Sequence, residues 1–222
     1  MFSFEAWWQI LTTKLPVFFQ GVGTTVELAL YTAIFGTLLG IVVALLRMSR
    51  VKLLKVLAGA YIEFLRGTPL LVQVLIVFYG LPQMGVKLPR MTAGTVALVI
   101  NSAAYMAEIV RSGIQAIDGG QTEASRSLGM NGAQTMIYII LPQAIKNILP
   151  AIGNEFVSII KESSILYTIG IYELTYQANK LASTNFRYLE TLTISALIYF
   201  VLTFTASRLL GMLERRMRRG DR

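Results

Sequence analysis

The 222-residue sequence contains no cysteine and no histidine. This absence excludes disulfides, thiolate nucleophiles, histidine-based triads and the metal sites that depend on either ligand. Charged residues are also scarce, at 14% of the chain, where a soluble domain has about 25%. Hydrophobic residues make up 55%, which exceeds the roughly 45–50% of soluble domains and excludes a disordered chain. The composition therefore favours a membrane protein with no thiol or metal chemistry.

Long hydrophobic runs support this assignment, because a spanning helix needs about 20 mostly apolar residues. Residues 21–46 contain one charge, Glu27, and residues 67–86, within the longer run 56–86, contain none. Residues 91–107 and 191–207 are also uncharged, and hydrophobic residues continue past Arg208 to residue 213. A weaker run, 147–160, carries Glu155; it continues from Pro142 and is followed by a second apolar stretch, 164–172. We expect an all-α integral membrane protein with about five spanning helices.

The location of the basic residues predicts the orientation. The net charge of +8 would suggest nucleic acid binding in a soluble protein, but here the cations follow the first, third and last runs. Cytoplasmic loops carry an excess of Lys and Arg, so we expect the N-terminus outside, a basic cytoplasmic tail over residues 209–222, and no nucleic-acid partner. The residues concerned are Arg47, Arg50, Lys52, Lys55, Arg111, Arg208, Arg215, Arg216, Arg218, Arg219 and Arg222.

Residues 1–20 are rich in aromatic side chains, including Trp7, Trp8, Phe18 and Phe19. They lack the basic start and small-residue cleavage site of a secretory signal. One interpretation is an interfacial helix on the outer surface, anchored by its aromatic rings at headgroup level. A packed extension of the first span is equally consistent with the pattern.

The longest polar stretch of the interior sequence opens a loop over residues 112–142, which the charge pattern places in the cytoplasm. Asp118-Gly119-Gly120 is a turn and helix-start signal. Residues 121–128 then form a predicted short amphipathic helix that ends at Gly129, where a residue without Cβ allows the turn. Such a helix usually only connects two spans.

The spacing within this loop is more specific than its composition. It resembles the cytoplasmic EAA loop of ABC importer permeases, whose pattern is E-A-A, three residues, G, nine residues, I, one residue, L-P. Every spacing is kept, and the one departure is serine for the second alanine. The matching residues are Glu123, Ala124, Ser125, Gly129, Ile139, Leu141 and Pro142.

Three further segments, at residues 63–71, 105–111 and 154–164, resemble motifs of the polar amino acid branch of the same family. The resemblance covers essentially the whole chain as a single permease domain, residues 1–222. It implies the permease subunit of a type I ABC importer, similar to arginine, histidine and glutamine permeases.

The resemblance also implies a coupling helix that docks on a separate ATPase subunit. The residues expected there are Glu123, Ala124, Ser125, Arg126, Leu128 and Gly129. The sequence has no G-x-x-x-x-G-K-[ST] phosphate loop, so we expect no catalytic residues, no metal and no cofactor in this chain. ATP and Mg are expected on two ATP-binding partner subunits. The other expected partners are an extracellular substrate-binding protein, a second permease subunit (identical or homologous) and the lipid bilayer.

Polar residues at membrane depth predict the pathway, because ionisable groups there cost about 2.5–3.5 kcal/mol and normally face a cavity or a partner. Helical spacing places Asn101, Tyr105 and Glu108 on one stripe. It also places five polar residues on one broad face: Asn154, Glu155, Ser158, Lys161 and Glu162. A third stripe carries Glu63, Arg66 and Gln73, where Pro69 interrupts the helix and frees a backbone carbonyl. The alternative is interhelical glue through Glu63–Arg66 and Glu108–Arg111 pairs.

From these stripes we predict a substrate site in which a carboxylate accepts from a cationic group and amides or hydroxyls fix the rest. Its residues are Glu155, Asn154, Ser158, Asn101, Tyr105 and Gln73. Glu155 favours a basic amino acid, and glutamine stays an alternative. A stand-alone secondary transporter or channel is the competing function, but the chain shows no internal repeat. Gly36 and Gly40 form a G-x-x-x-G pattern that predicts close helix packing.

Overall fold

The structure, a computed structural model, describes residues 2–218 and the side chains of residues 2–216. Every regular element among these residues is helical, which confirms the expected fold class. The elements are α1 (Phe4–Arg47), α2 (Lys52–Gly67), α3 (Leu70–Leu75), the π-helical turn η1 (Ile76–Gly80), α4 (Leu81–Gln83), α5 (Arg90–Gln115), α6 (Gly119–Ser127), α7 (Gly132–Thr135), the π-helical turn η2 (Met136–Ile140), α8 (Leu141–Glu162), the 3-10 segment η3 (Ser163–Ile169), α9 (Leu174–Asn185) and α10 (Tyr188–Arg218).

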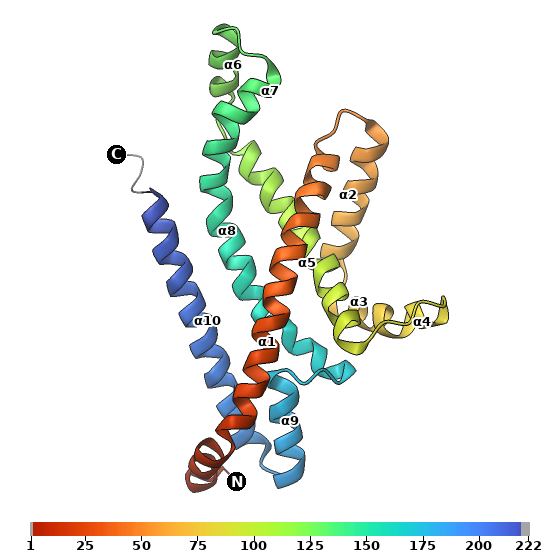
Figure 1. Cartoon of the computed structure of the whole chain (residues 1–222), viewed down its shortest axis with the longest axis vertical. Coiled ribbons are helices and arrows are strands. Elements are labelled where there is room, and N and C mark those ends of the chain that lie inside the picture. The colour runs from red at the N-terminus through yellow and green to blue at the C-terminus, as the bar shows by residue number, and fades with distance from the viewer. Residues whose placement is uncertain (1, 219–222) are drawn as a thin grey trace.

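Four of the described helical stretches are long and apolar enough to cross a membrane, and a fifth is possible if a bent pair counts as one span. The four are Phe4–Arg47, Arg90–Gln115, Gly132–Ile169 and Tyr188–Arg216. The expected second span over 56–86 is a bent pair of helices, because the chain bends by 108° between α2 and the segment Leu70–Gln83, on either side of the predicted break at Pro69. The uncharged half therefore turns sideways and extends out from the bundle instead of continuing α2 (Figure 1).

Figure 1 shows which parts of the chain share an end of the bundle. The α1–α2 connection, α6 and the end of α10 lie at one end, and the start of α1 lies with α9 at the other. The basic residues that follow α1 and those late in α10 therefore gather at one end, together with the predicted coupling helix.

The N-terminal residues 4–20 belong to α1, which includes Pro16. Ile10 and Phe18 pack in a buried cluster with Leu174 of α9 and Ile194 of α10. This contact shows how the segment is held to the bundle, and its position at a membrane interface stays a prediction.

Helices α1 and α5 approach closely because α1 presents glycines to its partner. A Cβ on Gly36 would lie 3.0 Å from Ser102 Oγ, and one on Gly40 would lie 2.4 Å from Met106 Cβ. The structure therefore confirms that Gly36 and Gly40 permit tight helix packing. In lipid the hydrophobic effect does not drive helices together, so close packing of this kind is a main source of helix–helix association.

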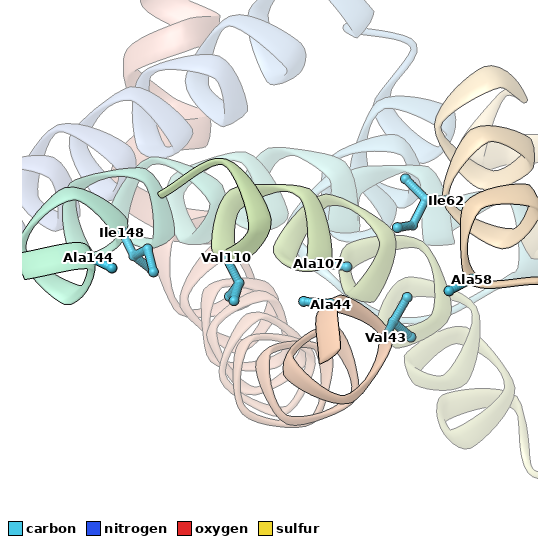
Figure 2. Packing of buried hydrophobic residues seen from close by; sticks show 8 residues of the cluster. All are labelled: Val43, Ala44, Ala58, Ile62, Ala107, Val110, Ala144 and Ile148. Carbon is cyan, nitrogen blue, oxygen red and sulfur yellow. The ribbon is translucent and has the colours of Figure 1, made fainter. Parts of the chain in front are cut away.

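A buried cluster with several small side chains joins α1, α2, α5 and α8 near the basic end of the bundle (Figure 2). One alanine from each helix takes part, and valine and isoleucine fill the space between them. The eight residues are Val43, Ala44, Ala58, Ile62, Ala107, Val110, Ala144 and Ile148.

The bend after α2 is stabilised by a side-chain amide. Pro69 has no N–H, so the carbonyl of Leu65 four residues earlier loses its helical partner. Gln73 Nε2 donates to that carbonyl oxygen at 2.8 Å and also lies 2.8 Å from Thr68 Oγ1. Gln73 Oε1 in turn accepts from Asn101 Nδ2 of α5 at 2.9 Å. The freed backbone group is thus satisfied inside the protein, as a lipid environment requires.

We predict that Gly40→Ala lowers the stability of the helix pair. The new Cβ would collide with Met106 Cβ and with the backbone of Ala103, and overpacking of this kind costs about 1–3 kcal/mol. The measurement is the thermal unfolding midpoint of the purified chain in detergent. Gly23→Ala in the same helix is the control, because nothing lies within 4 Å of its Cβ position. Equal midpoints for the two variants would contradict the packing role.

Gln73→Leu is predicted to destabilise the bend. Loss of the amide leaves the Leu65 carbonyl without this donor, and an unsatisfied buried polar group costs about 1–3 kcal/mol. The same unfolding experiment measures this loss, with Gln83→Leu as a control on an exposed glutamine of α4. An unchanged midpoint for Gln73→Leu would show that another group satisfies the carbonyl.

Candidate functional site

Two of the predicted substrate residues, Gln73 and Asn101, lie side by side, and their side chains are hydrogen-bonded to each other. Their side chains are buried, at 7% and 3% exposure. Their mutual hydrogen bond and the bonds of Gln73 to the helix break occupy much of their polar capacity. The geometry gives both residues a role in positioning α2 and α3 against α5.

Glu155 of α8 is half-buried and faces α5, where Ser102 Oγ donates to Glu155 Oε1 at 3.3 Å. Gly36 of α1 leaves the space that Ser102 fills. Within the described side chains, no cation lies at ion-pair distance from Glu155. The carboxylate therefore keeps acceptor capacity for a cationic group.

Asn154 and Ser158 lie on other parts of α8. Asn154 is exposed and lines a mainly apolar groove of about 390 Å³ between α1, α8 and α10. Ser158 is half-buried one turn farther along α8. Asn154 is therefore not part of the Glu155–Ser102 contact, although both were expected on one broad face.

The ring of Tyr105 contacts Arg66, a cation that the sequence analysis had paired with Glu63. The guanidinium of Arg66, at the end of α2, is 5.4 Å from the centre of the Tyr105 ring. This is cation–π distance. Arg66 is also within electrostatic range of Glu108 and Glu155. Arg66 and Tyr105 thus add a positive group to the region around Glu155.

One of the two expected ion pairs is confirmed. Arg111 Nε donates to Glu108 Oε2 at 2.9 Å, and Arg111 Nη2 contacts the other carboxylate oxygen. The expected Glu63–Arg66 pair is wrong. Glu63 Oε1 lies 3.7 Å from Arg47 Nη2 of α1, because the end of α1 lies beside α2, and Arg66 stacks on Tyr105.

The predicted coupling helix is present as α6, Gly119–Ser127. Asp118 Oδ1 accepts from the Gly120 N–H at 2.7 Å and caps its start. At its end, Gly129 has φ +82°, its N–H donates to the Arg126 carbonyl, and the Met130 N–H donates to the Ser125 carbonyl. This pair of bonds is the Schellman motif, so Gly129 ends the helix as expected.

The predicted coupling residues divide by exposure. Ser125 is buried, and its hydroxyl lies 2.9 Å from Thr135 Oγ1 of α7. No ion pair joins Glu123 to Arg126 among the described side chains. Leu128 is 85% exposed. The exposed candidates are Glu123, Ala124, Arg126, Leu128 and Gly129. An apolar side chain this exposed beside unpaired charges leaves one surface of α6 open to a partner, and docking there stays a prediction.

Sequence reasoning missed Ser102 and misplaced Arg66. Ser102 follows Asn101 directly, so it falls outside the Asn101–Tyr105–Glu108 stripe, and only the small Gly36 opposite it could have signalled the contact. No group of three acidic side chains in the described part of the chain could hold a metal ion.

Comparisons with known proteins agree on one family. The family model described as "Binding-protein-dependent transport system inner membrane component" matches residues 36–219. The probable amino-acid permease protein YxeN of Bacillus subtilis (strain 168) is 39% identical over 213 residues, which is 95% of each chain. The arginine transport system permease protein ArtQ of the same organism is 40% identical over 209 residues, or 94% of this chain and 95% of that one.

A solved structure extends this similarity to three dimensions. The crystal structure of an amino acid ABC transporter with histidines contains a chain with a TM-score of 0.91 and 50% sequence identity. The match covers 97% of this chain and 99% of that one. Its spans and its relatives make the protein a multi-pass component of the inner membrane. The chain belongs to the binding-protein-dependent transport system inner membrane components, as an amino-acid ABC transporter permease of the type I importer fold.

Proposed function

We propose that the chain is the membrane-spanning subunit of an ATP-driven importer that moves a polar, basic amino acid into the cytoplasm by alternating access. The observation that carries this proposal is Glu155, a half-buried carboxylate on a spanning helix that contacts Ser102 and has no described cation at ion-pair distance. Such a group at membrane depth marks a substrate or ion pathway.

The charges around Glu155 suit a zwitterionic ligand. Glu155 accepts from the ammonium or guanidinium group of the substrate, and such charge-assisted bonds are the stronger ones. Arg66, held over Tyr105, offers a donor to the substrate carboxylate. Ser158 and Asn154 remain proposed contacts, and Gln73 and Asn101 support the site through the bend. The relatives include an arginine permease and a probable glutamine permease, so glutamine is the alternative substrate.

The partners follow from the family and from α6. Two ATP-binding subunits bind ATP and Mg and receive the exposed residues of α6, Glu123, Ala124, Arg126, Leu128 and Gly129, while Ser125 fixes α6 to α7. An extracellular binding protein delivers the substrate, and a second permease subunit, identical or homologous, completes the pathway. The relatives give no support to a stand-alone transporter or channel.

The orientation proposal rests on the end of the bundle that carries α6. Because α6 lies at the same end as the α1–α2 connection and the end of α10 (Figure 1), that end faces the cytoplasm and the start of α1 faces outside. The loop over residues 112–142 is then the cytoplasmic coupling loop. The basic tail, residues 209–222, is cytoplasmic, and its last four residues lie outside the described part.

We predict that Glu155→Gln reduces arginine uptake about tenfold or more, since a bond to a charged group contributes about 1.5–3 kcal/mol. The measurement is uptake of labelled arginine by proteoliposomes that contain the permease, its ATPase and its binding protein. Glu63→Gln is the matched control, because the Glu63 side chain is 78% exposed. If arginine uptake is unchanged in Glu155→Gln, or falls equally in both variants, Glu155 is not part of the substrate site.

Leu128→Ala tests the docking of α6. The side chain is 85% exposed, so its truncation should leave the fold intact and weaken contact with the ATPase. We expect the stimulation of ATP hydrolysis by loaded binding protein to fall several-fold, while unstimulated hydrolysis by the ATPase persists. Leu53→Ala, at a similarly exposed leucine of α2, should leave stimulation unchanged. Full stimulation in Leu128→Ala would contradict this docking surface.

A further inference from the structure

The one charge in the first hydrophobic run, Glu27, lines a cavity between α1, α5 and the segment that follows η3. The cavity has a volume of about 500 Å³. Its wall consists of Thr24 and Glu27 of α1, Arg90 and Met91 at the start of α5, and residues 170–172 before α9. None of these residues belongs to the proposed substrate site or to α6, so the proposed function leaves Glu27 without a role.

The guanidinium of Arg90 is held against the backbone of this cavity. Its Nη1 donates to the Gly170 carbonyl at 3.1 Å. Gly170 ends η3 with φ +74°, and a Cβ there would lie 3.0 Å from that Nη1 and 3.4 Å from Cζ. The glycine therefore permits both the turn and the close approach of the guanidinium. An arginine has five N–H donors, so Arg90 keeps donors for a ligand.

Glu27 lines the same cavity as Arg90 but does not pair with it. Within the described side chains, no hydrogen bond or ion pair engages the Glu27 carboxylate. Ionisable groups in spanning helices normally face a partner or a cavity, and here the cavity is present and the partner is not a side chain of this chain. Two opposite charges that share a cavity beyond ion-pair distance suit a ligand that carries both a cation and an anion.

An apolar groove continues from the cavity along the same two helices. It has a volume of about 480 Å³, and Met91 lines both spaces. Helical spacing places Tyr31 and Phe35 one and two turns beyond Glu27 on the same face of α1. On α5, Thr95 follows Met91 by one turn and donates its hydroxyl to the Met91 carbonyl, so the hydroxyl is already satisfied. The other apolar residues of the groove wall are Val96, Val99 and Ile100.

The two spaces lie at different depths. Arg90 is the first residue of the span Arg90–Gln115, and Glu27 lies near the start of the apolar run 21–46. Figure 1 shows the start of α5 toward the end of the bundle opposite α6. Tyr31 and Phe35, farther into the apolar run, are 45% and 53% exposed. A molecule that fills both spaces therefore has charged groups at the membrane boundary and an apolar chain within the bilayer.

We propose that the cavity and the groove together bind one zwitterionic phospholipid with a primary ammonium, of the phosphatidylethanolamine type. The ammonium donates to Glu27, the phosphate accepts from Arg90, and an acyl chain lies in the groove between α1 and α5. Both headgroup contacts are charge-assisted hydrogen bonds, which are stronger than neutral ones. A free amino acid carries the same two charges but would leave the apolar groove unfilled.

The site is separate from Glu155 and from α6, so lipid binding does not depend on the transported substrate or on the ATPase. In the orientation proposed above, the bound lipid belongs to the outer leaflet. Only this choice of leaflet rests on the proposed function.

Native mass spectrometry of the full-length chain in a neutral detergent tests the headgroup contacts. Phosphatidylethanolamine and phosphatidylcholine are titrated separately, and the preference is the ratio of their affinities. The second lipid has the same phosphate, but its methylated ammonium has no N–H to donate. We expect wild type to prefer phosphatidylethanolamine and Glu27→Gln to lose about fivefold of that preference. Glu5→Gln, which removes an exposed carboxylate from the same helix, is the matched control and should stay within twofold of wild type.

Val99→Trp tests the groove without changing any charge. The larger side chain should fill part of the acyl-chain space and weaken both lipids about fivefold, while the preference between them persists. A wild-type chain without preference, an equal loss in Glu5→Gln and Glu27→Gln, or unchanged affinities in Val99→Trp would overturn the proposal. Displacement of bound phosphatidylethanolamine by free arginine would overturn the lipid as occupant in favour of an amino acid.

Discussion

The interior of a bilayer offers no water to a broken helix, so each backbone group that a proline frees must find a partner within the protein. At Pro69 that partner is the amide of Gln73, which reaches the Leu65 carbonyl and is itself held by Asn101. The bend of 108° depends on this arrangement. It ends α2 at the depth where Arg66 reaches the Tyr105 ring, so a backbone requirement determines where a charge of the proposed pathway lies.

A second chain of contacts links packing to chemistry. The absence of a side chain at Gly36 lets α5 approach α1, and this approach positions Ser102. Ser102 then donates to Glu155 on α8. The carboxylate at the centre of the proposed substrate site is therefore oriented by a glycine two helices away, and small residues in spanning helices shape the site as well as the bundle.

The sequence predicted features that depend on length, spacing and turn chemistry. These include the helical class, the number of spans, the end of α6 at Gly129, the close packing at Gly40 and the Glu108–Arg111 pair. It predicted the helix break at Pro69 but not the 108° bend there, because hydropathy measures how apolar a run is and not its direction. It also failed to pair Arg66 and did not predict the bond between Gln73 and Asn101, because helical periodicity assigns a residue to a face but does not say which neighbour that face meets.

The hydrogen bond between Gln73 and Asn101 has a consequence for biogenesis. The Gln73 amide can donate to the Leu65 carbonyl as soon as the bend forms. Its side-chain oxygen, Oε1, has its donor on Asn101, which is synthesised 28 residues later. The half-finished segment therefore carries an unmatched polar atom while α5 is still outside the membrane. Residues 52–115 should consequently leave the insertion machinery as one unit, with the bent span retained in the translocon until α5 arrives.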